Sequence, residues 1–263
     1  MGNYVKSMSN SPISPEFVFA ASAGLVADTQ VLFAVGHVAN VGTASPPIDV
    51  CEQGTLYPFL ATAQILKVSS ASAADTAAGT GARAVIIQGL DANFNQIQET
   101  VIMNGVAAVN TVNAYLRVNS FYVSAAGSGQ INALDITLQL VAGGSAQGII
   151  RAGIGVSQQA VLTVPNGFVG VLTAAQFSMA GSPATNFGQV ALNANVGGPT
   201  ARVNGVRSDI NSGFPYNEAV LIGFPNPPQT DITARIISVG QNSTEISAGF
   251  QIVLLRQNYL TAN

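Results

Sequence analysis

The segment at residues 79–95, GTGARAVIIQGLDANFN, combines two patterns that occur in ligand-binding sites. Its first six residues match G-x-G-x-x-A, the glycine turn that places a pyrophosphate at a helix N-terminus in dinucleotide-binding folds. Such a site needs a strand before the turn and a helix after it. Here residues 69–78 are small and polar, and residues 85–90 are β-branched and strand-like. We therefore interpret the glycines as a loop that enters a strand, and we predict no bound cofactor.

The end of the same segment resembles the start of a calcium-binding loop. Asp91, Asn93 and Asn95 match D-x-N-x-N, but a calcium loop also needs glycine at its sixth position and a bidentate glutamate at its twelfth. Those positions hold Gln96 and Ile102. Asp and Asn are also favoured in turns, because their side chains bond to their own backbone. We therefore predict a hairpin turn without a metal ion.

The remaining residues that could do chemistry are few and scattered. The chain has one cysteine, Cys51, and one histidine, His37, which excludes an internal disulfide, a multi-cysteine metal site and a two-histidine metal site. No local motif around Cys51 supports a cysteine–histidine nucleophile. Asp91 and Glu99 could meet across the predicted hairpin, although two such carboxylates are more often solvated than catalytic. We predict no catalytic, cofactor-binding or metal-binding residues and no enzymatic activity.

Most of the chain shows the alternation of apolar and polar side chains that is typical of β-strands. The clearest run is residues 131–141, in which Leu134, Ile136, Leu138 and Leu140 share one face. Residues 91–95 join two further runs and have a normal length for a hairpin loop. The predicted strands are residues 82–90, 96–103, 131–141, 156–164, 168–179, 189–196, 218–224, 231–239 and 246–256.

Short strands at regular spacing, separated by polar turns, indicate β-sandwiches of the jelly-roll kind. We predict an all-β chain with two jelly-roll-like β-sandwich lobes and an extended N-terminal arm. The arm covers residues 1–55, which have several prolines, no clean period and at most a short strand at residues 29–35. The first β-sandwich region covers residues 56–146 and the second covers residues 147–263. Gly143-Gly144-Ser145 is the predicted linker between them.

The composition points to assembly. Charged residues make up 8% of the chain, against roughly 25% in an average soluble protein. Protein–protein interfaces are depleted in Lys, Glu and Asp at their centres, so we expect neighbouring subunits to cover much of this surface. The alternative, a monomer with a neutral Ser/Thr/Asn surface, stays open. The net charge of −3 argues against nucleic-acid binding, which needs a basic face.

The sequence predicts neither a membrane-spanning segment nor a secretion signal. No apolar run reaches the roughly 18 residues needed to cross a bilayer. Residues 17–27, FVFAASAGLVA, resemble the apolar stretch of a signal peptide. Pro12, Pro15 and Glu16 precede that stretch and only Lys6 supplies positive charge. We therefore expect neither a cleaved signal nor a membrane partner.

Four blocks of the chain, in the expected order, resemble virion structural proteins of tailed bacteriophages, especially phages of cyanobacteria and marine bacteria. The first block is GTLYPFLATAQILKVSSASAADTAAGTGARAVIIQGLDANFNQIQETVIMNG, and the others are AYLRVNSFYVSAAG, LTVPNGFVGVL and TDITARIISVGQNSTEISAGFQIVLL. The resemblance covers roughly residues 52–256. The chain departs from the family at Asn166-Gly167-Phe168, where Ala-Gly-Lys is usual, and at Pro227-Pro228-Gln229, where an acidic–basic pair is common. Both departures remove charge.

The resemblance implies a β-rich particle component without catalytic residues. Together with the low charge, it predicts a capsid decoration or cement protein that binds and stabilises the phage head shell. The expected partners are the chain itself, as a homo-oligomer for which the class suggests a trimer, and the major capsid protein or other virion proteins. The expected location is the virion, assembled in the cytoplasm of the host bacterium. A tail, baseplate or fibre-base component and a glycan-binding host-recognition module are the alternatives.

Overall fold

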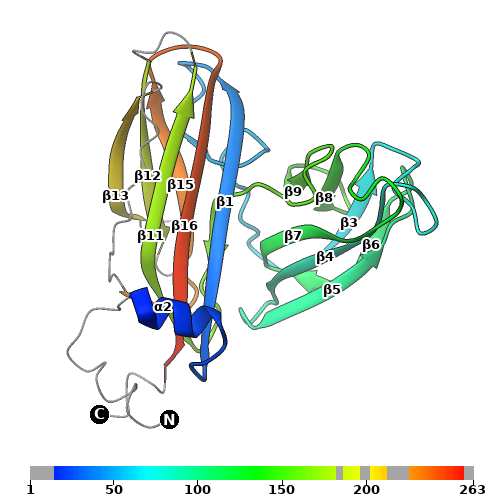
Figure 1. Cartoon of the computed structure of the whole chain (residues 1–263), viewed down its shortest axis with the longest axis horizontal. Helices are drawn as coiled ribbons and strands as arrows, with labels where there is room; N and C mark the ends of the chain where they lie inside the picture. Colours follow the sequence, from blue (N-terminus) through cyan, green and yellow to red (C-terminus); the bar gives the residue numbers. More distant parts are fainter. Residues whose placement is uncertain (1–14, 182–185, 196–201, 212–224, 258–263) are drawn as a thin grey trace.

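The protein is described by a computed structural model that covers residues 15–181, 186–195, 202–211 and 225–257. These residues form two lobes of antiparallel β-sheet and one short helix, α2 (Pro15–Ser22). Figure 1 shows the longer lobe with α2 lying across one end, and the second lobe beside it. The predicted all-β fold is therefore confirmed, while its jelly-roll description stays a prediction.

The longer lobe, which we call the base lobe, takes its strands from both ends of the chain. One sheet has the order β1-β16-β11-β14, and the facing sheet has the order β10-β15-β12-β13, with β2 paired to β15. Apolar side chains from both sheets, among them Phe177, Ile236 and Ile252, form the core between them. The strands are β1 (Thr29–Val41), β2 (Ile48–Asp49), β10 (Val161–Thr163), β11 (Phe168–Ala180), β12 (Phe187–Asn195), β13 (Arg202–Asn211), β14 (Pro225–Asn226), β15 (Asp231–Val239) and β16 (Thr244–Arg256).

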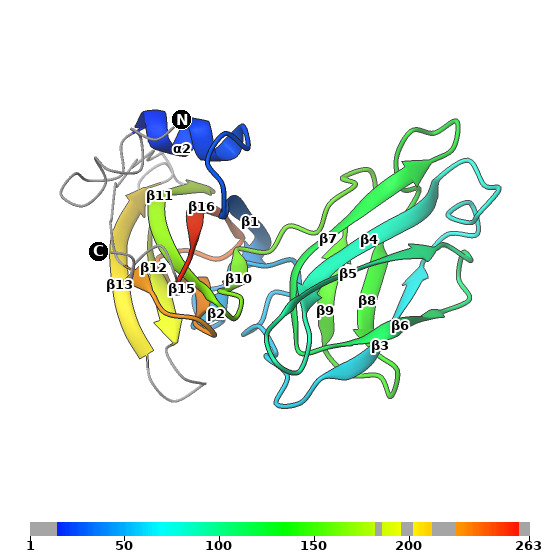
Figure 2. The same ribbon diagram turned by 90° about the horizontal axis from the view of Figure 1, so that it is seen from below.

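The other lobe, which we call the inserted lobe, lies in the sequence between β2 and β10. A four-stranded sheet of order β6-β3-β8-β9 packs against a three-stranded sheet of order β5-β4-β7 around a core that includes Leu66, Ile87, Phe121 and Leu138. Figure 2 shows this lobe beside the base lobe. Its strands are β3 (Gln64–Ser70), β4 (Ala82–Leu90), β5 (Gln96–Ile102), β6 (Val109–Tyr115), β7 (Arg117–Ala126), β8 (Ile136–Leu140) and β9 (Ala146–Ile150).

The extended N-terminal arm predicted for residues 1–55 is wrong for the part that the structure describes. β1 pairs with β16 from Thr29 opposite Leu255 to Val41 opposite Thr244, with one irregularity between Val38 and Val41. Ala34, Val38 and Val41 on its inner face belong to the base-lobe core. An arm that reached other subunits would have to give up this ladder and this burial. Residues 1–14 lie outside the described part of the chain.

The predicted division at residue 146 also differs from the observed pairing. The base lobe contains β1 and β2 as well as the strands after residue 160, so the inserted lobe interrupts it. The predicted linker Gly143-Gly144-Ser145 is the turn of the β8–β9 hairpin, where the two glycines have φ values of 87° and 108°. Glycine adopts such left-handed conformations without steric cost, in hairpin turns as in linkers.

The strand predictions agree best where the alternation is cleanest. Residues 82–90 and 231–239 match β4 and β15. The runs at residues 131–141 and 156–164 are longer than the observed β8 and β10. The strand predicted at residues 218–224 lies outside the described residues.

The helix α2 occupies part of the stretch that resembles a signal peptide. It begins at Pro15, a residue favoured in the first turn of a helix because its missing N–H has no partner there in any case. Phe17 and Val18 pack against the cluster of Val171, Val253 and Leu255 on β11 and β16. The apolar character of this stretch therefore serves packing within the base lobe.

Candidate functional site

The glycine motif at residues 79–84 forms a loop that runs directly into β4, with a strand where a dinucleotide site would have a helix. The carboxylate of Asp75 organises this loop, since its Oδ1 accepts hydrogen bonds from the backbone N–H of Ala82 (2.7 Å) and of Ala133 (2.8 Å). A Cβ atom on Gly81 would lie 2.1 Å from that Oδ1. Glycine is therefore required for close packing of backbone against the buried carboxylate.

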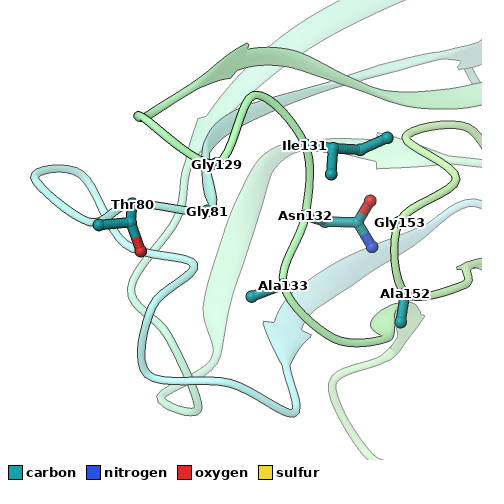
Figure 3. Close-up of a pocket in the computed structure, with 8 residues that line it drawn as sticks. All are labelled: Thr80, Gly81, Gly129, Ile131, Asn132, Ala133, Ala152 and Gly153. Carbon is teal, nitrogen blue, oxygen red and sulfur yellow. The ribbon is translucent and has the colours of Figure 1, made fainter.

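A hollow of about 450 Å³ lies beside this loop (Figure 3). The most polar side chain that lines the hollow is that of Asn132, but its amide already has hydrogen-bond partners. Nδ2 donates to the carbonyls of Leu134 and Arg151, and Oδ1 accepts from the N–H of Gly155. No charged side chain lines the hollow, so it holds neither an acid–base pair nor an anchor for a phosphate. The lining residues are Thr80, Gly81, Gly129, Ile131, Asn132, Ala133, Ala152 and Gly153.

The calcium-like motif forms the β4–β5 hairpin loop. Oδ1 of Asp91 accepts hydrogen bonds from the N–H groups of Asn93 (2.8 Å) and Asn95 (2.9 Å), and Oδ2 accepts one from the Asn95 amide (3.2 Å). Desolvation is the largest single influence and raises the pKa of the Asp91 carboxyl, but the hydrogen bonds donated by Asn95 and Asn93 together outweigh it, so the net pKa is lowered. The carboxylate thus builds the turn that the sequence predicts.

This hairpin loop also docks on the base lobe. The carbonyl of Phe94 accepts a hydrogen bond of 2.8 Å from the N–H of Asn166, which belongs to the turn before β11. The ring of Phe94 lies 5.5 Å from the guanidinium carbon of Arg117. The loop therefore helps to hold the two lobes together, a role that its sequence does not reveal.

Glu99, the other carboxylate considered for this hairpin, turns away from Asp91. Its two oxygens accept hydrogen bonds from the backbone N–H groups of Val112 (2.7 Å) and Asn113 (2.9 Å) on the edge strand β6. An unpaired strand edge is a template for unwanted pairing, and Glu99 occupies part of this one. The two acids do not form a catalytic pair.

His37 and Cys51 also have separate partners. Nδ1 of His37 lies 3.1 Å from Oε1 of Glu52, while the Cys51 thiol contacts the Thr55 carbonyl at 3.7 Å. Burial, and next to it the charge of Asp49, raises the pKa of Cys51 to about 12. A thiol with that pKa stays protonated at neutral pH and does not act as a nucleophile.

Sequence reasoning missed two ionic connections between the lobes within the described residues. Arg117 of β7 forms a two-pronged pair with Asp231 of β15, with Nε–Oδ1 at 2.7 Å and Nη2–Oδ2 at 2.9 Å. Both side chains are buried. Arg151, after β9, bridges Glu52 (2.6 Å) and Asp135 (2.8 Å). The hydrogen bond that Arg151 donates to the Glu52 carboxylate is the largest influence on the pKa of the Arg151 guanidinium and raises it.

The described residues contain no group of three His, Cys, Asp or Glu side chains that could hold a metal ion. In the same part of the chain no helix has the length and apolarity to cross a membrane. The polar clusters therefore tie strands and lobes together, and none of them combines a nucleophile, a base and a binding space.

Comparisons with known protein families and with curated proteins found no match. Among solved structures, the VP2 subviral particle of infectious bursal disease virus aligns over 95% of this chain and 80% of its own, with 12% identity and a TM-score of 0.15. T=1 particles derived from the same virus align over 88% and 71%, with 10% identity and a TM-score of 0.15. The similarity to these viral particle structures is weak, and at such TM-scores it carries no argument about function.

Proposed function

We propose that this protein is a non-enzymatic structural component of a virion, which assembles with copies of itself and with the particle shell as a decoration or cement protein. The observation that carries the proposal is a surface with even less charge than the composition suggests. The protein uses many of its few ionic groups internally.

Five charged side chains in the described residues are buried: Asp49, Asp75, Arg117, Asp231 and Arg235. Arg235 pairs with Asp49 at 2.7 Å inside the base lobe. Glu52 is engaged by His37 and Arg151, and Glu99 by backbone N–H groups. A typical soluble surface has roughly 25–35% charged residues to keep molecules apart. The low charge that remains outside favours close contact between neighbours.

Large apolar side chains are exposed on both lobes. In the inserted lobe, Val106 and Val112 are 65% and 86% exposed. In the base lobe, Phe19 and Phe187 are 75% and 60% exposed. Single exposed apolar residues are ordinary, but on this surface they lack the charged surroundings that keep molecules apart in solution. Contacts with other subunits would bury them.

In the proposed mechanism the protein does not change conformation, and the outer faces of its two lobes bind neighbouring subunits. The N-terminal strand is part of that body, so cementing by an arm at residues 29–50 has no support. The Arg117–Asp231 pair, the Glu52–Arg151 pair and the docked hairpin loop would keep the lobes in one arrangement, so that a neighbour meets a fixed surface. Trimer formation and the choice of the head shell rest on the resemblance described above.

The test is immunogold labelling of purified virions with an antibody against the purified chain, together with co-sedimentation of the chain with empty shells. A decoration protein labels heads and sediments with shells. Labelling of tails alone would support the tail or baseplate alternative. Unlabelled virions and no sedimentation with shells would refute a structural role in the particle.

A further inference from the structure

The two lobes enclose a cleft between β1 and the outer face of the β5-β4-β7 sheet, which we call the interlobe cleft. It consists of two hollows, of about 290 Å³ and 210 Å³, and Asn119 lines both. Binding pockets for small molecules span roughly 300–1,000 Å³, so the cleft has the size of a modest ligand site. It is separate from the hollow in Figure 3.

One wall of the cleft is a row of side-chain amides and a hydroxyl. Gln88 of β4 lies opposite Gln98 of β5 on one side and opposite Ser120 of β7 on the other. Gln96 stands two residues from Gln98 and therefore on the same face of β5. Gln30 of β1 meets this row from the other wall.

These amides are held in place while keeping unused hydrogen-bonding capacity. Gln30 and Gln96 bond each other in both directions, at 3.2 Å and 2.8 Å, and Gln88 donates to Gln98 at 2.8 Å. Each amide offers two donors and two acceptor positions. These contacts leave unused donors and acceptors side by side along the row. Because the side chains are already held in place, less conformational entropy is lost when a ligand binds.

The chemistry of the cleft selects against ions. None of the residues that line its two hollows is Asp, Glu, Lys, Arg or His. Apolar surface lies beside the amides, since Phe33, Val35 and Val156 line the second hollow and are 64%, 49% and 43% exposed. The matching ligand is uncharged, has adjacent groups that both donate and accept, and has apolar patches between them.

We propose that the interlobe cleft binds a neutral oligosaccharide. Every sugar hydroxyl is both donor and acceptor, as the amide row requires, and the C–H faces of a pyranose ring can pack on Phe33. An extended polypeptide is the less suitable occupant at this wall, because β4 is already hydrogen-bonded on both sides and offers only side chains. This site goes beyond assembly into a particle and does not depend on it.

The test is isothermal titration of the full chain with maltohexaose, cellohexaose and hexa-N-acetylchitohexaose, each up to about 10 mM, a range that detects dissociation constants of about 1 mM or tighter. We expect saturable binding of at least one. The double variant Gln88→Ala/Gln98→Ala should weaken it about tenfold or more, because two hydrogen-bonding groups are lost. The matched control Gln139→Ala, on the other sheet of the same lobe, should bind as the wild type does. If the double variant does not fold, Gln30→Ala on the opposite wall replaces it, with the same expected direction.

The proposal is wrong if none of the three sugars binds, or if the double variant binds as tightly as the wild type. It is also wrong if the cleft takes a polypeptide instead. In that case amide hydrogen exchange across residues 29–37 slows as the protein concentration rises, while no sugar binds.

Discussion

Replacing Arg117 by methionine should weaken the contact between the two lobes and lower the free energy of unfolding. Arg117 is the inserted-lobe partner of Asp231, and the two side chains are 8% and 3% exposed. Nη1 of Arg117 also donates to the carbonyls of Leu60 (2.8 Å) and Leu116 (2.9 Å). Methionine keeps most of the side-chain volume and removes every one of these hydrogen bonds.

The expected cost follows from the charge that stays behind. In Arg117→Met, Asp231 remains buried with the Thr163 hydroxyl at 2.6 Å as its side-chain partner. Removing one member of a buried ion pair costs about 3–5 kcal/mol, because the other charge is left uncompensated. For a chain of this size each kcal/mol lowers Tm by about 2–4 °C, so we expect a loss of about 6–20 °C.

The assay is urea and thermal unfolding followed by circular dichroism, compared among five proteins: the wild type, Arg117→Met, Asp231→Asn, their double variant and a control. Arg256→Met is the matched control, because its pair with Asp28 is exposed (55% and 49%) and should be worth about 0–1 kcal/mol. The double variant Arg117→Met/Asp231→Asn should be at least about 2 kcal/mol more stable than the sum of the single variants, since no charge is then stranded. A cost below about 1 kcal/mol for Arg117→Met would refute this account of the lobe contact.

Three further results are expected. Gly81→Ala should destabilise the protein by about 1–3 kcal/mol in thermal unfolding, because its Cβ would lie 2.1 Å from Asp75 Oδ1, whereas Thr80→Ala at an exposed neighbouring position should change little. The folded-state pKa of Asp91 is lowered, so its contribution to stability is present above its ordinary value of 3.8 and is lost as pH falls through the folded value; Asp91→Asn should remove that part of the acid dependence of the urea midpoint. Cys51, whose burial raises its pKa to about 12, should stay unreactive toward a thiol reagent at pH 8 until the protein is unfolded in urea; fast labelling of the native chain would contradict its placement.

The strands with regular alternation could be predicted from sequence because their buried residues recur at every second position. Ile232, Ala234 and Ile236 recur every second residue, and β15 has the predicted bounds. Of β1 (Thr29–Val41), only a short strand at residues 29–35 could be predicted, because its inner face includes Ala34 and Gly36. Gly36 is small because Val50 and Ala160 approach it, and a Cβ there would lie 2.0 Å from the Val50 carbonyl oxygen. Where two backbones pack closely, the buried position holds glycine, so the sequence has no apolar side chain there to mark the inner face of the strand.

The insertion of one lobe into the other is a property of long-range pairing. β1 pairs with β16 across most of the length of the chain, and periodicity reports which face of a strand is buried without naming its partner. Gly143 and Gly144 were predicted as a linker on local grounds, but positive φ angles occur in hairpin turns as readily as in linkers.

The candidate site could be predicted in part. The turn built by Asp91 follows from residue type, because its hydrogen bonds run to residues two and four positions away. The ion pairs could not be predicted, since Arg117 and Asp231 are 114 residues apart and Arg235 and Asp49 are 186 apart. In a chain with so few charges, the scattered arginines were a sign that each could have a specific acidic partner.

The central claim is that a body with few charged residues, several of which are buried, is covered by other subunits. The most direct measurement is sedimentation velocity of the full chain between about 1 and 100 μM, a range that brackets μM association constants, in low and in high salt. The account predicts species larger than the 26.8 kDa monomer that grow with concentration and persist at high salt, because uncharged contacts are not screened. A single, highly soluble 26.8 kDa species at every concentration and in both salts would contradict it.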